Sequence, residues 1–211
     1  MQIRAEMLPD ILPVFPLRGA LLLPHSILPL RVFEPRYIAL VDDAFTVPRM
    51  FVMVQPRDGD SGKLYKTGCA GQITHFEERD DGTYTVLLRG IARVTLKEPC
   101  SDMKPYLRYN LDWREYHGDL KESSFKGFAL GQFCGLVERY FASIKYSVPI
   151  EKMRELGQEE LINMVACVAP FSEAEKQALL EAEDLQERCK IVQILMEMGC
   201  LSSQSEEFGG V

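Results

Sequence analysis

The clearest candidate for chemistry in the sequence is a glycine-rich loop that ends in Gly62 and Lys63. A phosphate-binding loop of the GxxxxGK[ST] type holds nucleotide phosphates with backbone N–H groups and the lysine. That pattern requires a glycine where Arg57 stands and a hydroxyl residue where Leu64 stands. Because both positions fail, we interpret residues 55–63 as a polar loop, and we expect no nucleotide and no other cofactor.

Histidines and cysteines are the other residues that could bind a metal or form a nucleophile and base. His25, His75 and His117 are far apart in sequence, and the six cysteines contain no Cys-x-x-Cys pair. Cys69 and His75 are six residues apart on an expected strand, so they would share a face but lie about 20 Å apart. That separation is too large for catalysis. The sequence therefore predicts no metal site, no catalytic residues and reduced, mostly buried cysteines.

Charge is distributed unevenly along the 211 residues. Residues 1–113 hold 14 Lys and Arg against 14 Asp and Glu, whereas residues 114–211 hold 10 against 17, which accounts for the whole net charge of −7. An acidic surface repels phosphate backbones, so we expect no nucleic-acid partner. No apolar run approaches the ~18 residues of a membrane helix, and no signal peptide is visible. These features predict a cytoplasmic protein.

Proline controls the expected structure from Leu12 to Phe45. Pro13 and Pro16 predict an irregular edge strand, because proline cannot donate to a sheet ladder. Pro35 suits the first turn of a helix near 35–45. Helical spacing places Tyr37, Leu40, Val41 and Ala44 on one face of that helix.

Short strands follow this helix, at 50–54, 68–77, 83–89, 91–96 and 106–113. Asp80-Asp81-Gly82 is typical of a tight hairpin. Gly90 interrupts the next strand and indicates a bulge or a close approach of another backbone. We therefore expect a β lobe over about 8–115.

The apolar period changes from 2 to 3.6 residues after Gly118, which predicts a helical lobe over 118–200. Its first helix runs from Phe125 to Ile144, its second begins at Gly157, and Ser172 with Glu175 forms a capping box for the third. Asp184 and Glu187 begin the fourth, which Gly199 is placed to end. Residues 201–211 are predicted to be a flexible tail.

Two collinear motifs resemble a known family. The first is LPVFPLRGALLLPHSILPLRVFEPRY at 12–37, with an LPxFPL strand, a crossing from Pro24 to Leu30 and an FEPRY helix start. The second combines GCAGQI at 68–73 with DGTYTVLLRGIARV at 81–94. Together they resemble the N-terminal domain of Lon proteases, the Lon substrate-binding domain, and the resemblance extends to about residue 200.

The resemblance implies an α+β fold, in which a small PUA-like β pseudo-barrel with a capping helix is followed by an α-helical bundle. It implies a stand-alone, bacterial-type member, because in full-length Lon the ATPase and the Ser–Lys peptidase follow this domain, and this chain ends before either could begin. We therefore expect a non-catalytic module that binds unfolded or apolar peptide segments, as an adaptor, regulator or weak chaperone.

Six residues are predicted to contact such a peptide. Leu21, Leu22 and Leu23 would form an exposed apolar patch. Glu34, Arg36 and Tyr37 stand at the helix start that the resemblance marks best. The alternative is that Glu34 and Arg36 form a local brace and Tyr37 is a core residue.

Gly127, Gly131 and Gly135 recur every four residues on the expected first helix of the second lobe. Each costs about 1 kcal/mol of helix propensity relative to alanine. We interpret them as a packing seam within the chain, with a peptide or homodimer seam as the alternative, and we expect a monomer or a weak homodimer.

Two other function classes stay open. A helix over a barrel makes a pocket, so a small-molecule or RNA-binding PUA-like module is the alternative, although the neutral β lobe weakens its RNA version. An enzyme ranks last, because no acid, base and nucleophile are assembled.

Overall fold

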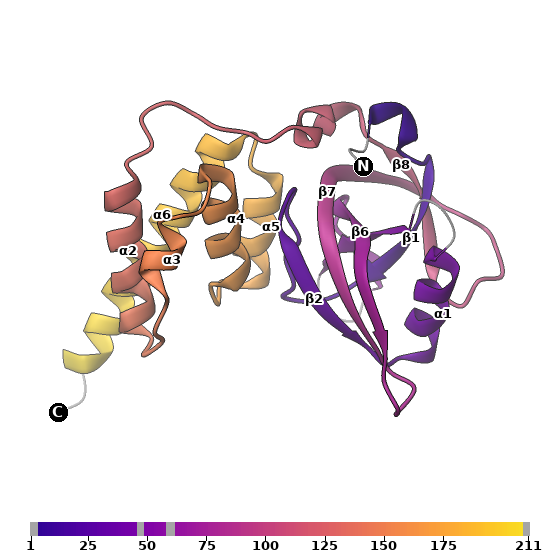
Figure 1. Ribbon diagram of the computed structural model, residues 1–211, viewed down its shortest axis with the longest axis horizontal. Helices are drawn as coiled ribbons and strands as arrows, with labels where there is room; N and C mark the ends of the chain where they lie inside the picture. Colours follow the sequence, from indigo (N-terminus) through magenta and orange to yellow (C-terminus); the bar gives the residue numbers. More distant parts are fainter. Residues whose placement is uncertain (1–3, 46–48, 58–61, 209–211) are drawn as a thin grey trace. The chain divides into compact units, whose positions relative to one another are not determined.

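The computed structural model describes residues 4–45, 49–57 and 62–208, with side chains described as far as Ser202. The chain divides into two compact units, Met1–Glu122 and Ser123–Val211. The first is built around a β sheet and the second is helical, so the predicted α+β fold, a pseudo-barrel with one helix followed by a helical bundle, is confirmed (Figure 1). Within the described residues, no helix combines the length and apolar character that crossing a membrane requires.

The sheet of the first unit closes into a barrel. Its strand order is β2-β7-β6-β3-β1-β8, and β7 also pairs with β8. This extra pairing closes a ring of five strands, β7-β6-β3-β1-β8, and β2 is attached to β7 outside the ring. The strands are β1 (Ile11–Pro16), β2 (Ile27–Val32), β3 (Met50–Val54), β6 (Thr67–Glu78), β7 (Tyr84–Pro99) and β8 (Leu107–Asp112). A small separate hairpin joins β4 (Pro56–Arg57) to β5 (Lys63–Leu64), and the 3-10 helices η1 (Ala5–Met7) and η2 (Arg114–Leu120) flank the barrel strands.

The prediction that β1 is an edge strand is wrong. It pairs with β8 from Ile11 to Val14 and with β3 from Val14 to Pro16, so only Val14 belongs to both ladders. This stagger gives Pro13 and Pro16 one neighbouring strand each. A proline is tolerated there because its missing N–H is required by at most one ladder.

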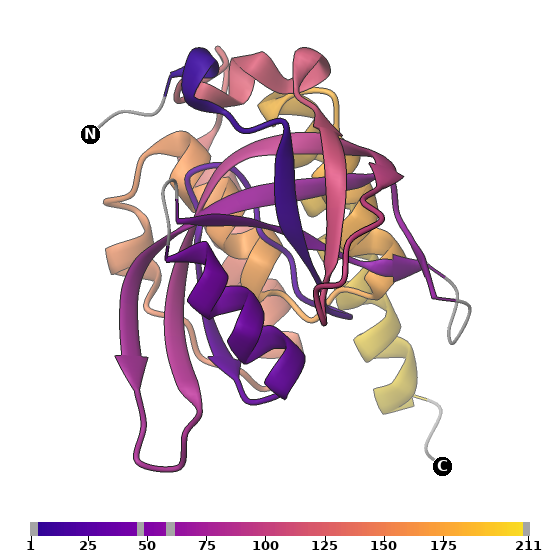
Figure 2. The same cartoon turned by 90° about the vertical axis from the view of Figure 1, so that its right-hand side faces the viewer.

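The long β6–β7 hairpin follows the sequence prediction. At its turn, Arg79 N–H donates to Thr83 O and Gly82 N–H donates to Arg79 O, both over 2.9 Å. Figure 2 shows the hairpin extending away from the rest of the barrel. Closer to the barrel, Ala70 pairs with Ala92 but Gly71 pairs with Gly90, so the predicted bulge is present.

The three leucines of the crossing between β1 and β2 are core residues, which contradicts their prediction as an exposed patch. Leu21, Leu22 and Leu23 are 2%, 2% and 0% exposed. Apolar side chains next to a turn enter the core when the backbone can approach the sheet closely, and Gly90 allows that approach. A Cβ at Gly90 would lie 2.0 Å from Leu23 O.

Two backbone hydrogen bonds hold this crossing on β7. His25 N–H donates to Gly90 O over 3.0 Å, and Gly90 N–H donates to Ser26 O over 2.9 Å. His25 takes a positive φ of 63°, an uncommon conformation for a residue with a side chain. The crossing is therefore a fixed part of the barrel.

Helix α1 (Pro35–Ala44) begins at Pro35 as predicted, and its predicted apolar face, Tyr37, Leu40, Val41 and Ala44, is buried. Tyr37 stacks on Phe15 of β1 with ring centroids 4.1 Å apart. This contact anchors the first turn of the helix on the barrel.

The helical unit contains α2 (Leu130–Ser143), α3 (Ile150–Met153), α4 (Gln158–Val168), α5 (Glu173–Glu181) and α6 (Leu185–Phe208). Helix α6 contacts α2, α4 and α5, and Figure 1 shows it running along α2. The core of the helical unit is formed by the fully buried residues Phe133, Val137, Leu161, Ile162, Leu179, Val192 and Met196. The short helix α3 has no counterpart in the sequence prediction.

Capping residues are where the sequence predicts them. Ser172 Oγ accepts a hydrogen bond from Glu175 N–H, and the Glu175 carboxylate accepts one from Ser172 N–H over 2.7 Å, so the capping box is complete. Asp184 Oδ1 accepts from Glu187 N–H over 2.8 Å at the start of α6. Helix α4 begins after Gly157, as predicted.

The predicted end of α6 at Gly199 is wrong, and the expected tail at 201–211 is helical through Phe208, with residues 209–211 outside the described part. Gly199 serves packing instead. A Cβ there would lie 2.5 Å from Cε2 of the buried Tyr140 on α2. Glycine therefore lets α6 pass close to the aromatic ring without ending the helix.

Replacing Gly90 by alanine should destabilise the barrel unit by about 2 to 3 kcal/mol, because the new methyl group meets backbone that cannot rotate away. Denaturant unfolding followed by the fluorescence of Trp113, the single tryptophan, measures the change. The control is Gly118→Ala, whose Cβ would have open space. Equal midpoints for the two variants would contradict the prediction.

In the helical unit, Gly199→Ala and Gly131→Ala should have opposite effects. The first forces Tyr140 to move and should cost about 1 to 3 kcal/mol. The second adds a methyl group that meets no atom within 4 Å on an exposed helical position, and should stabilise by about 0.5 to 1 kcal/mol. Thermal unfolding by circular dichroism measures both, and a stabilising Gly199→Ala would refute the packing argument.

Candidate functional site

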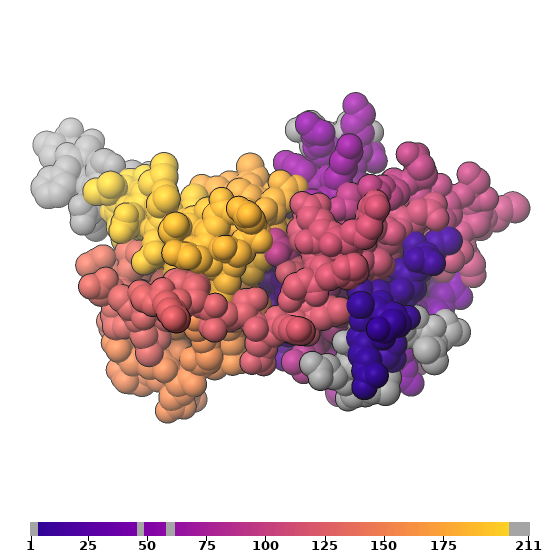
Figure 3. All heavy atoms as spheres, turned by 90° about the horizontal axis from the view of Figure 1, so that it is seen from above, coloured from indigo at the N-terminus to yellow at the C-terminus, as the bar shows by residue number. Residues whose placement is uncertain are grey.

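The segment from Leu8 to Pro13 separates two surface hollows of the barrel unit. Leu8 and Asp10 line one hollow, and Pro9, Ile11, Leu12 and Pro13 line the other. Figure 3 shows this N-terminal segment, in indigo, on the surface of the unit.

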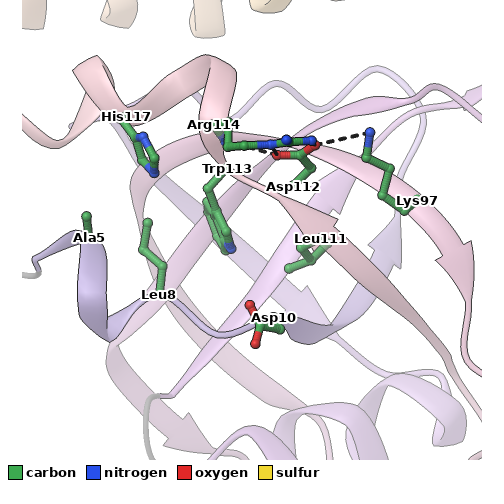
Figure 4. A pocket seen from close by; sticks show the side chains of 9 residues that line it. All are labelled: Ala5, Leu8, Asp10, Lys97, Leu111, Asp112, Trp113, Arg114 and His117. Atoms are coloured by element: carbon green, nitrogen blue, oxygen red, sulfur yellow. Dashed lines mark hydrogen bonds and ion pairs between the residues drawn. The ribbon is translucent and has the colours of Figure 1, made fainter.

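The first hollow, here the Trp113 hollow, has a volume of about 480 Å³. Figure 4 shows Ala5 and Leu8 on one side of it, His117 and Arg114 on another, and the ring of Trp113 between them. The indole is held in place, because its Nε1–H donates to Pro9 O over 2.9 Å.

The charges of the Trp113 hollow satisfy one another. Asp112 accepts two hydrogen bonds from the Arg114 guanidinium, at 2.6 and 2.9 Å, and lies 3.1 Å from Lys97 Nζ (Figure 4). The hydrogen bonds from Arg114 hold the pKa of Asp112 well below its usual range. A carboxylate kept ionised in this way is a poor general acid or base near neutral pH. The geometry favours a structural network over chemistry.

The second hollow, here the β1 hollow, has a volume of about 410 Å³. It lies where β1 and β3 separate and where α1 ends. Six of its ten lining residues are apolar and the other four carry polar or charged groups; the lining residues are Pro9, Ile11, Leu12, Pro13, Asp43, Ala44, Met50, Lys104, Tyr106 and Arg108. Ile11 is 37% exposed, and Met103, the sequence neighbour of the lining residue Lys104, is fully exposed. Apolar surface is therefore accessible at Ile11 in the hollow and at Met103 one residue away from its lining.

The polar rim of the β1 hollow is organised by Asp43, at the end of α1. Its carboxylate accepts a hydrogen bond from Lys104 Nζ over 2.8 Å and a short one from the Tyr106 hydroxyl. Hydrogen bonding to Lys104, and then to Tyr106, lowers the pKa of Asp43. Burial and the hydrogen bond to Asp43 raise the pKa of Tyr106.

This arrangement combines apolar side chains with fixed charges, as ligand-binding surfaces do. The apolar floor can accept a hydrophobic side chain, and the fixed charges around it can pair with polar groups of the same ligand. Among the residues that the structure describes, no group of three or more His, Cys, Asp or Glu side chains is placed to hold a metal ion.

The predicted site at the start of α1 lies at the other end of that helix, about 15 Å away along its length. Arg36 forms an ion pair with Glu34 over 2.8 Å and lies 4.5 Å from the centre of the Tyr37 ring. Tyr37 itself is buried. These contacts match the alternative of a local brace and a core tyrosine, and the peptide-binding role of Glu34, Arg36 and Tyr37 stays a prediction.

The predicted glycine seam is not formed as expected. Gly127 has a φ of 83° and precedes α2, so only Gly131 and Gly135 are helical. A Cβ at any of the three would meet no atom within 4 Å. The interpretation as packing within the chain is therefore wrong, because the glycines face open space.

Cys69 and His75 do not share a face, which corrects another expectation. Cys69 is buried and His75 is exposed. Ile73 pairs with Leu88 and His75 with Leu87, so Thr74 is an extra residue that reverses the alternation of β6. A bulge of this kind removes any pairing of the thiol with the imidazole.

The β1 hollow was not predicted from the sequence. Its lining comes from residues 9–13, from Asp43, Ala44 and Met50, and from residues 104–108, and the pairing of β1 with β8 brings the first set beside the last. The signal in the sequence that could have indicated it is Met103 between Asp102 and Lys104, an apolar residue flanked by two charges. This stretch lies between two expected strands and was interpreted only as their connection.

These features define a β barrel followed by a helical unit, and comparison with known proteins identifies the family. The chain belongs to the family described as ATP-dependent protease La (LON) substrate-binding domain, whose model matches residues 11–198. The recognition made from the two sequence motifs is therefore confirmed.

Curated relatives are whole Lon proteases. The chain is 27% identical over 201 residues to Lon protease 2 of Myxococcus xanthus, and 23% identical over 197 residues to Lon protease of Escherichia coli strain K12. These alignments cover 90% and 88% of the chain but 24% of each relative. The chain thus spans about a quarter of the length of these proteases.

Solved structures share the fold. A Lon N-terminal domain protein from Xanthomonas campestris matches with a TM-score of 0.63 and 23% identity, over 88% of this chain and 96% of that one. The N-terminal domain of Lon protease from the Mycobacterium avium complex also matches with a TM-score of 0.63, at 15% identity, over 89% and 98% of the two chains.

The Asp43 cluster makes a measurable prediction about pH. In the folded protein Asp43 should titrate below its usual pKa, and Tyr106→Phe should raise that value because one hydrogen bond to the carboxylate is lost. Since folding lowers the pKa, the cluster stabilises the fold above about pH 4, and this contribution disappears as the pH falls through the folded-state value. Carboxyl NMR titration measures the shift. An unchanged Asp43 titration in Tyr106→Phe would contradict the assignment.

Proposed function

We propose that this chain is a non-catalytic recognition module that binds exposed apolar segments of other proteins in the β1 hollow. Membership of the substrate-binding domain family over residues 11–198 carries the proposal. The match covers a recognition domain, and about three quarters of each protease relative lies outside it. We propose that the chain acts in the cytoplasm as an adaptor, a regulator or a weak chaperone.

The β1 hollow is the preferred site because of its surface chemistry. Leu12, Met50 and Ala44 provide an apolar floor, while Ile11 leaves apolar surface exposed at the edge. A volume of about 410 Å³ accommodates one or two large side chains of a peptide. Burial of each such side chain contributes about 1.5 to 3 kcal/mol.

The charged rim would set the orientation of the peptide. Lys104 and Asp43 hold each other in place, and Arg108 is oriented by Asp102 over 2.8 Å. Groups fixed before binding cost little entropy when the peptide arrives. A segment with an apolar residue flanked by polar ones would therefore suit the hollow best.

The alternative of a small-molecule or RNA-binding PUA-like module is not favoured. Each Lys or Arg that lines the two hollows is paired with a carboxylate: Lys97 and Arg114 with Asp112, Lys104 with Asp43 and Arg108 with Asp102. Paired cations attract a phosphate backbone less strongly.

Ile11→Gln combined with Met103→Gln should weaken peptide binding about 5- to 30-fold, because the first removes exposed apolar surface in the hollow and the second removes it next to the lining residue Lys104. Fluorescence anisotropy of the full chain with a labelled apolar peptide, and with an unfolded, carboxymethylated protein, measures the affinity. Both side chains are exposed, so the fold should be retained.

The matched control is Ile27→Gln, which removes an exposed isoleucine from β2 and should leave the affinity within about twofold. Arg36→Gln tests the predicted site at the start of α1 in the same assay. Loss of affinity in Ile27→Gln or Arg36→Gln, with none in the Ile11 and Met103 variant, would move the site away from the hollow. Absence of binding to any apolar peptide at high micromolar concentrations would refute the function.

A further inference from the structure

Helix α6 carries a second apolar face that points to solvent. Ile194, Met198 and Leu201 are 55%, 59% and 67% exposed, and Ile191 and Leu195 beside them are half-buried. Their spacing of three, four and seven residues places them in one stripe along the helix. This outer stripe is separate from the buried side chains of Val192 and Met196, which pack in the helical core.

A solvent-facing helix surface normally carries polar residues, so this outer stripe requires an explanation. Figure 3 shows the surface of α6, in yellow, uncovered in the view from above. Contiguous exposed apolar surface marks places where another molecule binds. The stretch from Lys190 to Leu201 is about 17 Å long, enough for three helical turns of contact.

Two charges beside the outer stripe indicate which molecule fits. Lys190 and Glu197 are both exposed. They are seven residues apart, nearly two full turns, so they lie on the same flank of the stripe. Within the part of the chain that the structure describes, neither side chain forms an ion pair. The helix therefore presents an unpaired cation and an unpaired anion on one flank.

Lys190 and Glu197 of one copy can pair with Glu197 and Lys190 of a second copy only when the two α6 helices run in opposite directions. With a two-fold axis near Ile194, Lys190 of one copy meets Glu197 of the other, and symmetry creates the same pair twice. A parallel two-fold arrangement would place the two copies of this flank on opposite sides of the contact, so Lys190 and Glu197 of different copies would not meet and neither ion pair would form. The charges thus select one direction, while the apolar side chains supply the affinity.

We propose that α6 is a homodimerisation face, on which a second copy of this chain docks antiparallel through Ile191, Ile194, Leu195, Met198 and Leu201. The residues of the pairing all belong to the helical unit, and none of them lines the β1 hollow. Dimerisation would double the number of β1 hollows in one particle, so two segments of the same unfolded protein could be bound together with a gain in avidity.

Sedimentation velocity of the full chain between 1 and 200 µM, roughly the range in which weak dimers dissociate, tests the proposal. We expect a concentration-dependent dimer. Ile194→Gln should weaken association at least about tenfold, because each copy loses a central apolar side chain. Val168→Gln removes another exposed apolar residue of the helical unit and should leave association unchanged. Circular dichroism confirms that each variant is folded.

Charge exchange gives the decisive measurement. Lys190→Glu and Glu197→Lys should each weaken the dimer about fivefold, because each creates two repulsive pairs. The double variant carrying both changes should restore the wild-type association within about twofold. Lys126→Glu changes the net charge by the same amount as Lys190→Glu, at another exposed lysine, and therefore controls for general charge repulsion between copies.

A chain that stays monomeric at 200 µM would overturn the proposal, as would a dimer that is insensitive to Ile194→Gln. Single charge reversals without effect, or a double variant that fails to recover, would overturn the antiparallel arrangement. Peptide binding by the β1 hollow is measured separately, so the two proposals can fail independently.

Discussion

The contact between Gly90 and the crossing at Leu21–Ser26 is the constraint on which the barrel unit depends. Two backbone hydrogen bonds join the crossing to β7. Because Gly90 has no side chain, Leu23 O can lie where it would clash with a Cβ atom at position 90. Three leucines consequently enter the core. Without that approach, the same leucines would be displaced toward solvent and the barrel would lose much of its apolar interior.

Once the barrel is closed, the positions of both hollows follow from strand geometry. β1 is shared between two ladders that overlap only at Val14, so its first residues diverge from β3 and leave the β1 hollow at the end of α1. The segment from Leu8 to Pro13 lines both hollows, with Leu8 and Asp10 at the Trp113 hollow and Pro9 and residues 11–13 at the β1 hollow. The paired charges around Trp113 stiffen one hollow, whereas the apolar floor of the other can accept a ligand.

The helical unit is governed by close packing around one ring. The ring of Tyr140 on α2 occupies the space that a side chain at position 199 would need, so glycine at this position allows α6 to pack closely against α2. The helix continues past this glycine to Phe208. Continuation of α6 past Gly199 adds Leu201 to the outer stripe that Ile194 and Met198 begin. The proposed peptide site and the proposed homodimerisation face thus belong to different units of one chain of the Lon substrate-binding domain family.

Local physics made much of this structure readable from the sequence. Proline at 35, the Asp-Gly turn and the Ser172–Glu175 capping box act through neighbouring residues, so the elements they define and the family motifs were predicted correctly. Whether Leu21–Leu23 are inside or outside, whether Gly199 ends a helix or admits a ring, and where three distant segments enclose the β1 hollow all depend on contacts between residues far apart in sequence. Those contacts are decided by packing in three dimensions, which no local pattern encodes.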